Sequence, residues 1–344
     1  MPRSLRYSAF ILLWLLLAPA VGRTADGYSA GRTYFGRNRY IEYLAGDLPV
    51  ILSAPHGGHE PPGELPDREQ GTFAYDTNTQ ELARAIADEL HARTGHWPHL
   101  IICRLHRRKV DCNREIGEGA AGNALAEQAW REFQGFIDAA QKTVEREHGR
   151  GLYVDLHGHG HIEQRLELGY LHTAEQLALS DAELNEPPNA AESSLRAIAI
   201  LGRMPYADLI RGPSSFGALM EQQGFPSSPS PSNPHPPPPF FRGGYNTARH
   251  GRDAAPVAGL QIETNSRGVR DTAQNRAKFA RALASALDTF LAVHAGVSLA
   301  PTSPEPKVVQ PAAAYAPASG EGATSRLHPR HRILRRARAF GMPN

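Results

Sequence analysis

"GLYVDLHGHGH", residues 151–161, joins a largely apolar run to three closely spaced histidines. A short apolar run of this kind predicts a strand that is buried on both faces of a sheet. Similar runs occur at 48–55, 99–105 and 257–263. Segments with helical periodicity lie at 77–95, around 130–149 and at 271–291. Strands that alternate with helices predict an α/β domain with a largely parallel or mixed sheet.

The N-terminus has the features of a secretory signal peptide, which we assign to residues 1–22. Arg3 and Arg6 precede an apolar run from Ala9 to Leu17, and small residues follow. An uncleaved membrane anchor is the alternative, but it needs about 20 apolar residues. We therefore expect an exported protein, periplasmic or secreted, without stable membrane insertion after cleavage. A net charge of +2 over 344 residues gives no electrostatic reason to expect nucleic acid as a partner.

The chain divides by composition into a catalytic domain at 28–296 and a tail at 297–344. The tail is rich in proline and alanine, ends in basic residues and is expected to be disordered. Inside the domain, the proline-rich stretch 226–239 fits no helix or central strand, so we expect an ordered excursion or a mobile loop. Cys103 and Cys112 are the only cysteines, and their spacing allows a disulfide or two buried thiols. Nothing in the sequence indicates an oligomeric state.

Polar side chains follow three of the predicted strands. His56 comes after the first strand, His157 lies at the end of the run at 151–156, and Glu263 interrupts the apolar run at 257–263. Sites in open α/β sheets assemble at the carboxyl ends of strands. A catalytic zinc needs three protein ligands and an open position for water. The two histidines supply two ligands; Glu60, His59 and Asp76 are candidates for the third.

The segment "RLHRRKVDCNRE", residues 104–115, is strongly basic. Such a stretch is usually a solvated surface. Its guanidinium groups also match the two oxygens of a carboxylate, so it is a candidate clamp for an acidic substrate.

Taken in order, five motifs resemble the N-formylglutamate amidohydrolases, distant relatives of zinc carboxypeptidases and aspartoacylases. The motifs are "SAPHGG" (53–58), "YDTNTQEL" (75–82), "RRKVDCNR" (107–114), "VDLHGH" (154–159) and "FFRGGYNTARHGRDAAPVAGLQIETN" (240–265). The resemblance spans about residues 48–270. It implies a three-layer α/β/α fold of the zinc-carboxypeptidase kind, with a central mixed, largely parallel sheet.

The resemblance also implies roles for individual residues. One zinc ion per chain is expected on His56, Asp76 and His157, with Glu60 as the alternative third ligand. Glu263 matches the general base, Arg107 the group that polarises the scissile carbonyl, and Tyr245 a tyrosine that relatives bring from a mobile loop. The substrate carboxylate is expected at Asn113, Arg114 and Arg108. Asp155 is expected either to orient a zinc ligand or to shape the turn at the strand end, and His159 and His161 either to line the cleft or to form a second metal site.

The sequence thus predicts an exported, zinc-dependent amidohydrolase. Its expected substrate is an N-acyl amino acid resembling N-formylglutamate, or a small peptide with a free carboxylate. A metallo-carboxypeptidase or a peptidoglycan amidase is the alternative among enzymes. A catalytically inactive module that binds carboxylate ligands is the alternative of another class, although a pure binder has no need of a base at Glu263.

Overall fold

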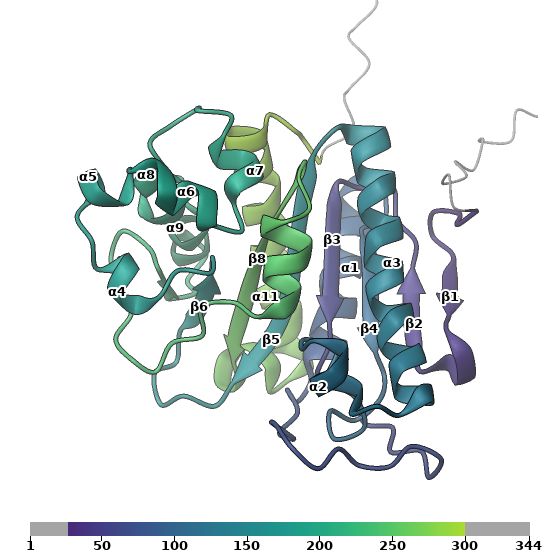
Figure 1. Cartoon of the computed structure of the whole chain (residues 1–344). Coiled ribbons are helices and arrows are strands. Elements are labelled where there is room, and N and C mark those ends of the chain that lie inside the picture. The colour runs from purple at the N-terminus through teal and green to yellow at the C-terminus, as the bar shows by residue number, and fades with distance from the viewer. Residues whose placement is uncertain (1–26, 300–344) are drawn as a thin grey trace, which may run out of the picture. The chain divides into compact units, whose positions relative to one another are not determined.

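The computed structural model describes residues 27–299, so the predicted signal peptide and nearly all of the predicted tail lie outside the described residues. An eight-stranded mixed sheet forms the centre of this part of the chain (Figure 1). From one edge to the other, its strands are β1 (Thr33–Phe35), β2 (Ile41–Leu44), β4 (His99–Cys103), β3 (Val50–Ala54), β5 (Gly151–His159), β8 (Val257–Asn265), β6 (Leu166–Gly169) and β7 (Ser227–Ser228).

The four strands predicted from apolar runs are the four central ones. β4, β3, β5 and β8 lie side by side and are all parallel, whereas β2 and β6 pair with them in the antiparallel direction. Burial on both faces explains why these four strands are apolar almost throughout. Their carboxyl ends consequently meet at one edge of the sheet.

Helices cover both faces of the sheet, so the predicted three-layer α/β/α arrangement is confirmed (Figure 1). α1 (Thr79–Thr94) and α11 (Ala273–Phe290) pack together on one face, where leucines and alanines of both helices join the larger hydrophobic cluster. α3 (Ala124–His148) covers the other face with Trp130, Phe133 and Ile137. Asn123 caps the start of α3 through its side chain, and Gly149 ends it in the left-handed conformation that glycine favours.

The start of α1 has no side-chain cap. The residue before the helix is Asn78, which has a left-handed backbone and makes no side-chain cap. The Thr79 hydroxyl instead donates to the Asp76 carbonyl at 2.8 Å. The turn before α1 is thus arranged around Asp76.

Shorter elements complete the domain. The α-helices are α2 (Ile116–Ala120), α4 (Ala174–Leu177), α5 (Asp181–Leu184), α6 (Pro187–Glu192), α7 (Arg196–Ala199), α8 (Tyr206–Arg211), α9 (Phe216–Gln222) and α10 (Tyr245–Thr247). The other helical turns are η1 (Arg37–Arg39), η2 (Ala248–Arg252), η3 (Ser266–Arg270) and η4 (Leu291–Ala295). No helix among residues 27–299 is long and apolar enough to cross a membrane.

The proline-rich stretch at 226–239 is an ordered excursion of the domain. It begins with β7, which pairs with β6 at the edge of the sheet. The Ser228 hydroxyl then donates to the Asn233 carbonyl, and the Ser230 hydroxyl donates to Glu221 on α9. Cys103 and Cys112 are both buried and free, in the hydrophobic cluster beneath α3.

Candidate active site

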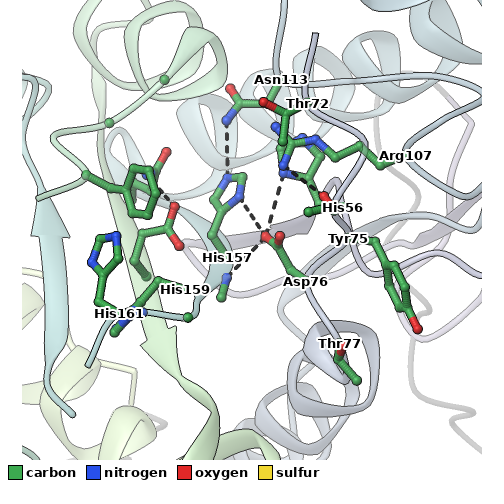
Figure 2. A pocket seen from close by; sticks show the side chains of 18 of the residues that line it. His56, Thr72, Tyr75, Asp76, Thr77, Arg107, Asn113, His157, His159 and His161 are labelled. Carbon is green, nitrogen blue, oxygen red and sulfur yellow. Dashed lines mark hydrogen bonds and ion pairs between the residues drawn. The ribbon is translucent and has the colours of Figure 1, made fainter. Parts of the chain in front are cut away.

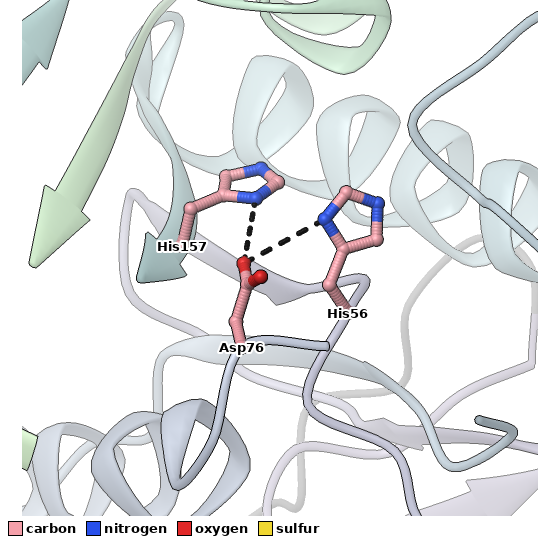
Figure 3. Close-up of side chains that lie close together, drawn as sticks. All are labelled: His56, Asp76 and His157. Carbon is pink, nitrogen blue, oxygen red and sulfur yellow. Dashed lines mark hydrogen bonds and ion pairs between the residues drawn. The ribbon is translucent and has the colours of Figure 1, made fainter. Parts of the chain in front are cut away.

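A cleft of about 870 Å³ opens at the carboxyl ends of the central strands. Three sequence-predicted residues meet in it, each from a different element: His56 follows β3, Asp76 precedes α1, and His157 lies near the end of β5. All three are nearly fully buried. Figure 3 shows the Asp76 carboxylate between the two imidazole rings.

The geometry of this group fits a zinc ion. Asp76 Oδ2 lies 3.2 Å from His157 Nδ1 and 3.6 Å from His56 Nδ1. Ligand atoms about 2.1 Å from a tetrahedral zinc are about 3.4 Å apart, which these two distances bracket. His56 Nδ1 is buried without a hydrogen-bond partner, so it is an orphaned nitrogen that a metal ion would satisfy.

A buried aspartate holds the far nitrogen of each histidine. Asp111 Oδ1 lies 2.6 Å from His56 Nε2, and Asp155 Oδ2 lies 2.9 Å from His157 Nε2. Histidines that bind metals almost always donate their second N–H in this way, which fixes the tautomer and directs the other nitrogen at the metal. Asp155 lies inside β5 rather than in a turn, so its geometry is that of a group that orients His157.

The charges of the group favour a bound cation. Burial lowers the pKa of His157, but Asp155 and Asp76 outweigh it and raise that pKa well above its ordinary value. Burial raises the pKa of Asp76, but the imidazoles of His157 and His56 outweigh it and hold that pKa far below its usual range. These carboxylates thus stabilise positive charge at the histidines, supplied by protons or by a metal.

Glu263 lies beside this group on β8, in register with His157. Successive side chains at the ends of β5 and β8 point to opposite faces of the sheet. Leu156 and Ile262 enter the core, whereas His157 and Glu263 line the cleft. Burial and, more weakly, neighbouring carboxylates raise the pKa of Glu263 to about 8, against the lowering effect of His157. A carboxyl group with a pKa near neutrality is suited to taking and returning protons.

Three residues of the basic segment line the cleft. Arg107 is buried; its Nε donates to Asp111 at 2.9 Å and its Nη1 to the Ala74 carbonyl at 3.2 Å. Asn113 Nδ2 lies 3.3 Å from His157 Nε2 (Figure 2). Arg114 borders the same cleft. Guanidinium and amide donors are therefore present next to the candidate metal group.

Three other predicted residues are not brought to this cleft. Arg108 is half exposed and faces Asp67. Glu60, the alternative third ligand, forms an ion pair with Arg104 at 2.6 Å. The ring of Tyr245 packs against Trp130, and this tyrosine lines a separate hollow beside Arg249. The aromatic contact places Tyr245 against the apolar cluster beneath α3 and outside the cleft, and its expected catalytic role stays a prediction.

The structure adds residues to the cleft that the sequence analysis did not assign. Tyr75 stands at the rim, next to Asp76. Arg270 lies beneath Gly158 and donates to the carbonyls of Thr264, His159 and Thr77. Tyr75 was detectable as the neighbour of a predicted ligand, whereas no local pattern marks Arg270, because its contacts come from distant segments.

Comparison with solved structures finds similar chains. An N-formylglutamate amidohydrolase from Ralstonia eutropha JMP134 is 16% identical with a TM-score of 0.45, and the match covers 75% of this chain and 99% of that one. A gene product from Agrobacterium tumefaciens is also 16% identical, with a TM-score of 0.43 and coverages of 74% and 95%. An N-acetylmuramyl-L-alanine amidase from Mycobacterium abscessus is 12% identical, with a TM-score of 0.31 and coverages of 72% and 100%.

The first of these structures carries the name of the family that the sequence motifs resemble. No protein-family model matches the chain, and no curated protein matches it in sequence.

Proposed function

We propose that this chain is an exported, zinc-dependent hydrolase that cleaves the amide bond of an N-acyl amino acid or small peptide with a free carboxylate. One observation carries the proposal: His56, Asp76 and His157 form a buried group with zinc-like spacing, next to Glu263 in a single cleft. Export is inferred from the signal-peptide features of residues 1–22.

Each residue of the site has its own role in the proposed amide hydrolysis. A zinc ion on the group would supply a Lewis acid and would lower the pKa of a bound water to about 7. Glu263 accepts a proton from the attacking water and returns it to the leaving amine. Arg107 donates hydrogen bonds to the developing oxyanion, and Asn113 and Arg114 hold the carboxylate of the substrate.

A peptidase or peptidoglycan amidase is the second candidate, and the size of the cleft favours it. About 870 Å³ is near the upper end of the range that encloses drug-sized ligands, and N-formylglutamate is much smaller than these. Phe73, Tyr75 and Phe241, on segments that form the cleft and its rim, expose much of their rings. Such a rim suits a substrate that extends beyond one amino acid.

The test combines metal content with turnover. The purified protein is loaded with zinc and assayed against N-formyl and N-acetyl amino acids, dipeptides and muropeptides, with and without chelator. We expect hydrolysis that the chelator abolishes, and the panel ranks the two candidate substrate classes. Stoichiometric zinc without hydrolysis of any substrate would leave the carboxylate-binding module as the better account.

Glu263→Gln tests the base. This variant should keep the zinc of the wild type and lose nearly all turnover, because the amide cannot accept the proton. Glu60→Gln is the matched control, since Glu60 pairs with Arg104 away from the cleft. Turnover that survives in Glu263→Gln would remove Glu263 from the base role.

A further inference from the structure

A second group of ligand-type side chains lies in the same cleft. One ligand atom each from His159, His161 and Glu167 lies within 4.8 Å of the others. His159 ends β5, His161 follows two residues later, and Glu167 lies on β6. In Figure 2, His159 and His161 lie apart from His56, with His157 between them. From this arrangement we propose that His159, His161 and Glu167 bind a second divalent transition-metal ion.

The orientation of the three side chains suits a metal. His159 Nε2 lies 2.8 Å from the Arg165 carbonyl, so this nitrogen donates; Nδ1 accepts the His161 backbone N–H at 3.1 Å, a hydrogen bond that a metal ion on Nδ1 would replace. Glu167 Oε2 accepts the Phe241 backbone N–H at 2.8 Å, which leaves Oε1 directed at His161 Nδ1, also at 2.8 Å. Each of these two ligands therefore has its second polar atom held by the backbone, as metal ligands usually do.

The charge balance gives a second, independent reason. Glu167 lies directly opposite Glu263 in the antiparallel pair of β6 and β8, and both are buried. Like charges at facing positions are destabilising, and a buried carboxylate needs a partner cation. The Arg165 guanidinium is 3.6 Å from Glu167 Oε1, too far for a hydrogen bond, so His161 is the hydrogen-bond partner of that oxygen. Arg165 thus supplies one cation at ion-pair distance to this pair of carboxylates, and a divalent ion between the three ligands would add a further positive charge.

The ligand types and access indicate which ion fits. Two imidazoles and one carboxylate suit zinc or cobalt better than magnesium or calcium. His161 keeps part of its surface in the cleft and stacks on Phe241, so an ion can enter from that side. His157 and His159 leave the same face of β5 about 7 Å apart.

Metal counting tests the proposal. The metal-free protein is reloaded with excess zinc sulfate and desalted, and zinc per chain is measured by elemental analysis. We expect two zinc ions in the wild type, one in His161→Ala, one in His157→Ala and none in the double variant. His59→Ala, which removes an exposed histidine outside both groups, should keep two. Glu167→Gln serves as a second ligand variant and should also hold one.

Cobalt loading gives a readout independent of stoichiometry. Difference absorption spectra between the wild type and His161→Ala should contain the bands of one cobalt with nitrogen ligands. One zinc in the wild type that is lost in His157→Ala and kept in His161→Ala would overturn the second site and leave the proposed function intact. One zinc lost only in His161→Ala would overturn the ligand set of the proposed function. No zinc in the wild type would overturn both.

Discussion

Replacing Gly158 with alanine should disturb the candidate metal site through a contact that the structure specifies. A Cβ atom at Gly158 would lie 2.3 Å from Arg270 Cζ and 2.6 Å from Nε and Nη1. Arg270 cannot move freely, because its guanidinium donates to the carbonyls of Thr264 and His159 at 3.1 and 3.0 Å and to Thr77. At least one of these charge-assisted hydrogen bonds must break or lengthen.

The expected cost follows from these contacts. A lost hydrogen bond to a charged group costs about 1.5–3 kcal/mol, and overpacking a filled site costs about 1–3 kcal/mol. We therefore expect Gly158→Ala to lower the free energy of unfolding by about 2–4 kcal/mol. The Gly158 N–H also donates to Asp76 Oδ2 at 3.1 Å, so zinc affinity should fall as well.

Urea unfolding and competition with a chromogenic zinc chelator measure the two effects. Gly160→Ala is the matched control, because nothing lies within 4 Å of a Cβ atom there. The control should stay within about 0.5 kcal/mol of the wild type, as surface changes usually do. Equal stabilities for the two variants would refute the clash with Arg270 and the anchoring role given to this arginine.

Three further predictions concern orientation, substrate binding and pH. Asp111→Asn should weaken zinc binding about 10–100-fold, because a neutral amide orients the His56 ring less firmly than the carboxylate does. Competition with a chelator measures the zinc affinity. Asp67→Asn changes an exposed aspartate and should match the wild type. Arg114→Ala should raise KM about tenfold or more for substrates with a free carboxylate and much less for their amides, because Arg114 is proposed to hold that carboxylate. Arg108→Ala should leave both KM values unchanged, and equal effects of Arg114→Ala on both substrates would contradict the clamp. Burial lowers the pKa of His99 to about 3, so between pH 6.5 and 3 the unfolded chain binds one more proton and the free energy of unfolding falls by up to about 1.4 kcal/mol per pH unit. Urea unfolding from pH 7 to pH 5 gives the slope of the free energy of unfolding against pH, and His99→Gln should remove the His99 contribution from that slope. An unchanged slope would contradict the prediction.

The sheet was predictable because its central strands leave a local signal. Four apolar runs mark β3, β4, β5 and β8, and burial on both faces requires such runs. The same logic located the cleft, since polar residues after parallel strands gather at one edge. His56 and His157 were found in this way, whereas Asp76 rested on the family resemblance, because the start of a helix by itself does not identify a ligand.

The positions that differed from expectation depend on contacts between distant segments. Tyr245 follows two glycines, and only the packing of α10 against Trp130 decides which way its ring turns. Arg107 and Arg108 are neighbours in the sequence. The Arg107 guanidinium binds Asp111 at the cleft, whereas the Arg108 guanidinium faces Asp67 outside it. No local pattern in the segment separates these two arginines.

The energetics of the cleft argue for a functional role rather than a purely structural one. Asp111, Asp155 and Glu263 are all buried, although the core next to them is built from well-packed aliphatic side chains. Buried ion pairs often contribute less stability than apolar residues of the same volume, so a network of this size is not retained for stability alone. Each carboxylate here also lies next to His56 or His157, or in register with one of them. Carboxylates that concentrate negative potential on two histidines in an accessible cleft are the arrangement that the proposed metal-dependent hydrolase requires.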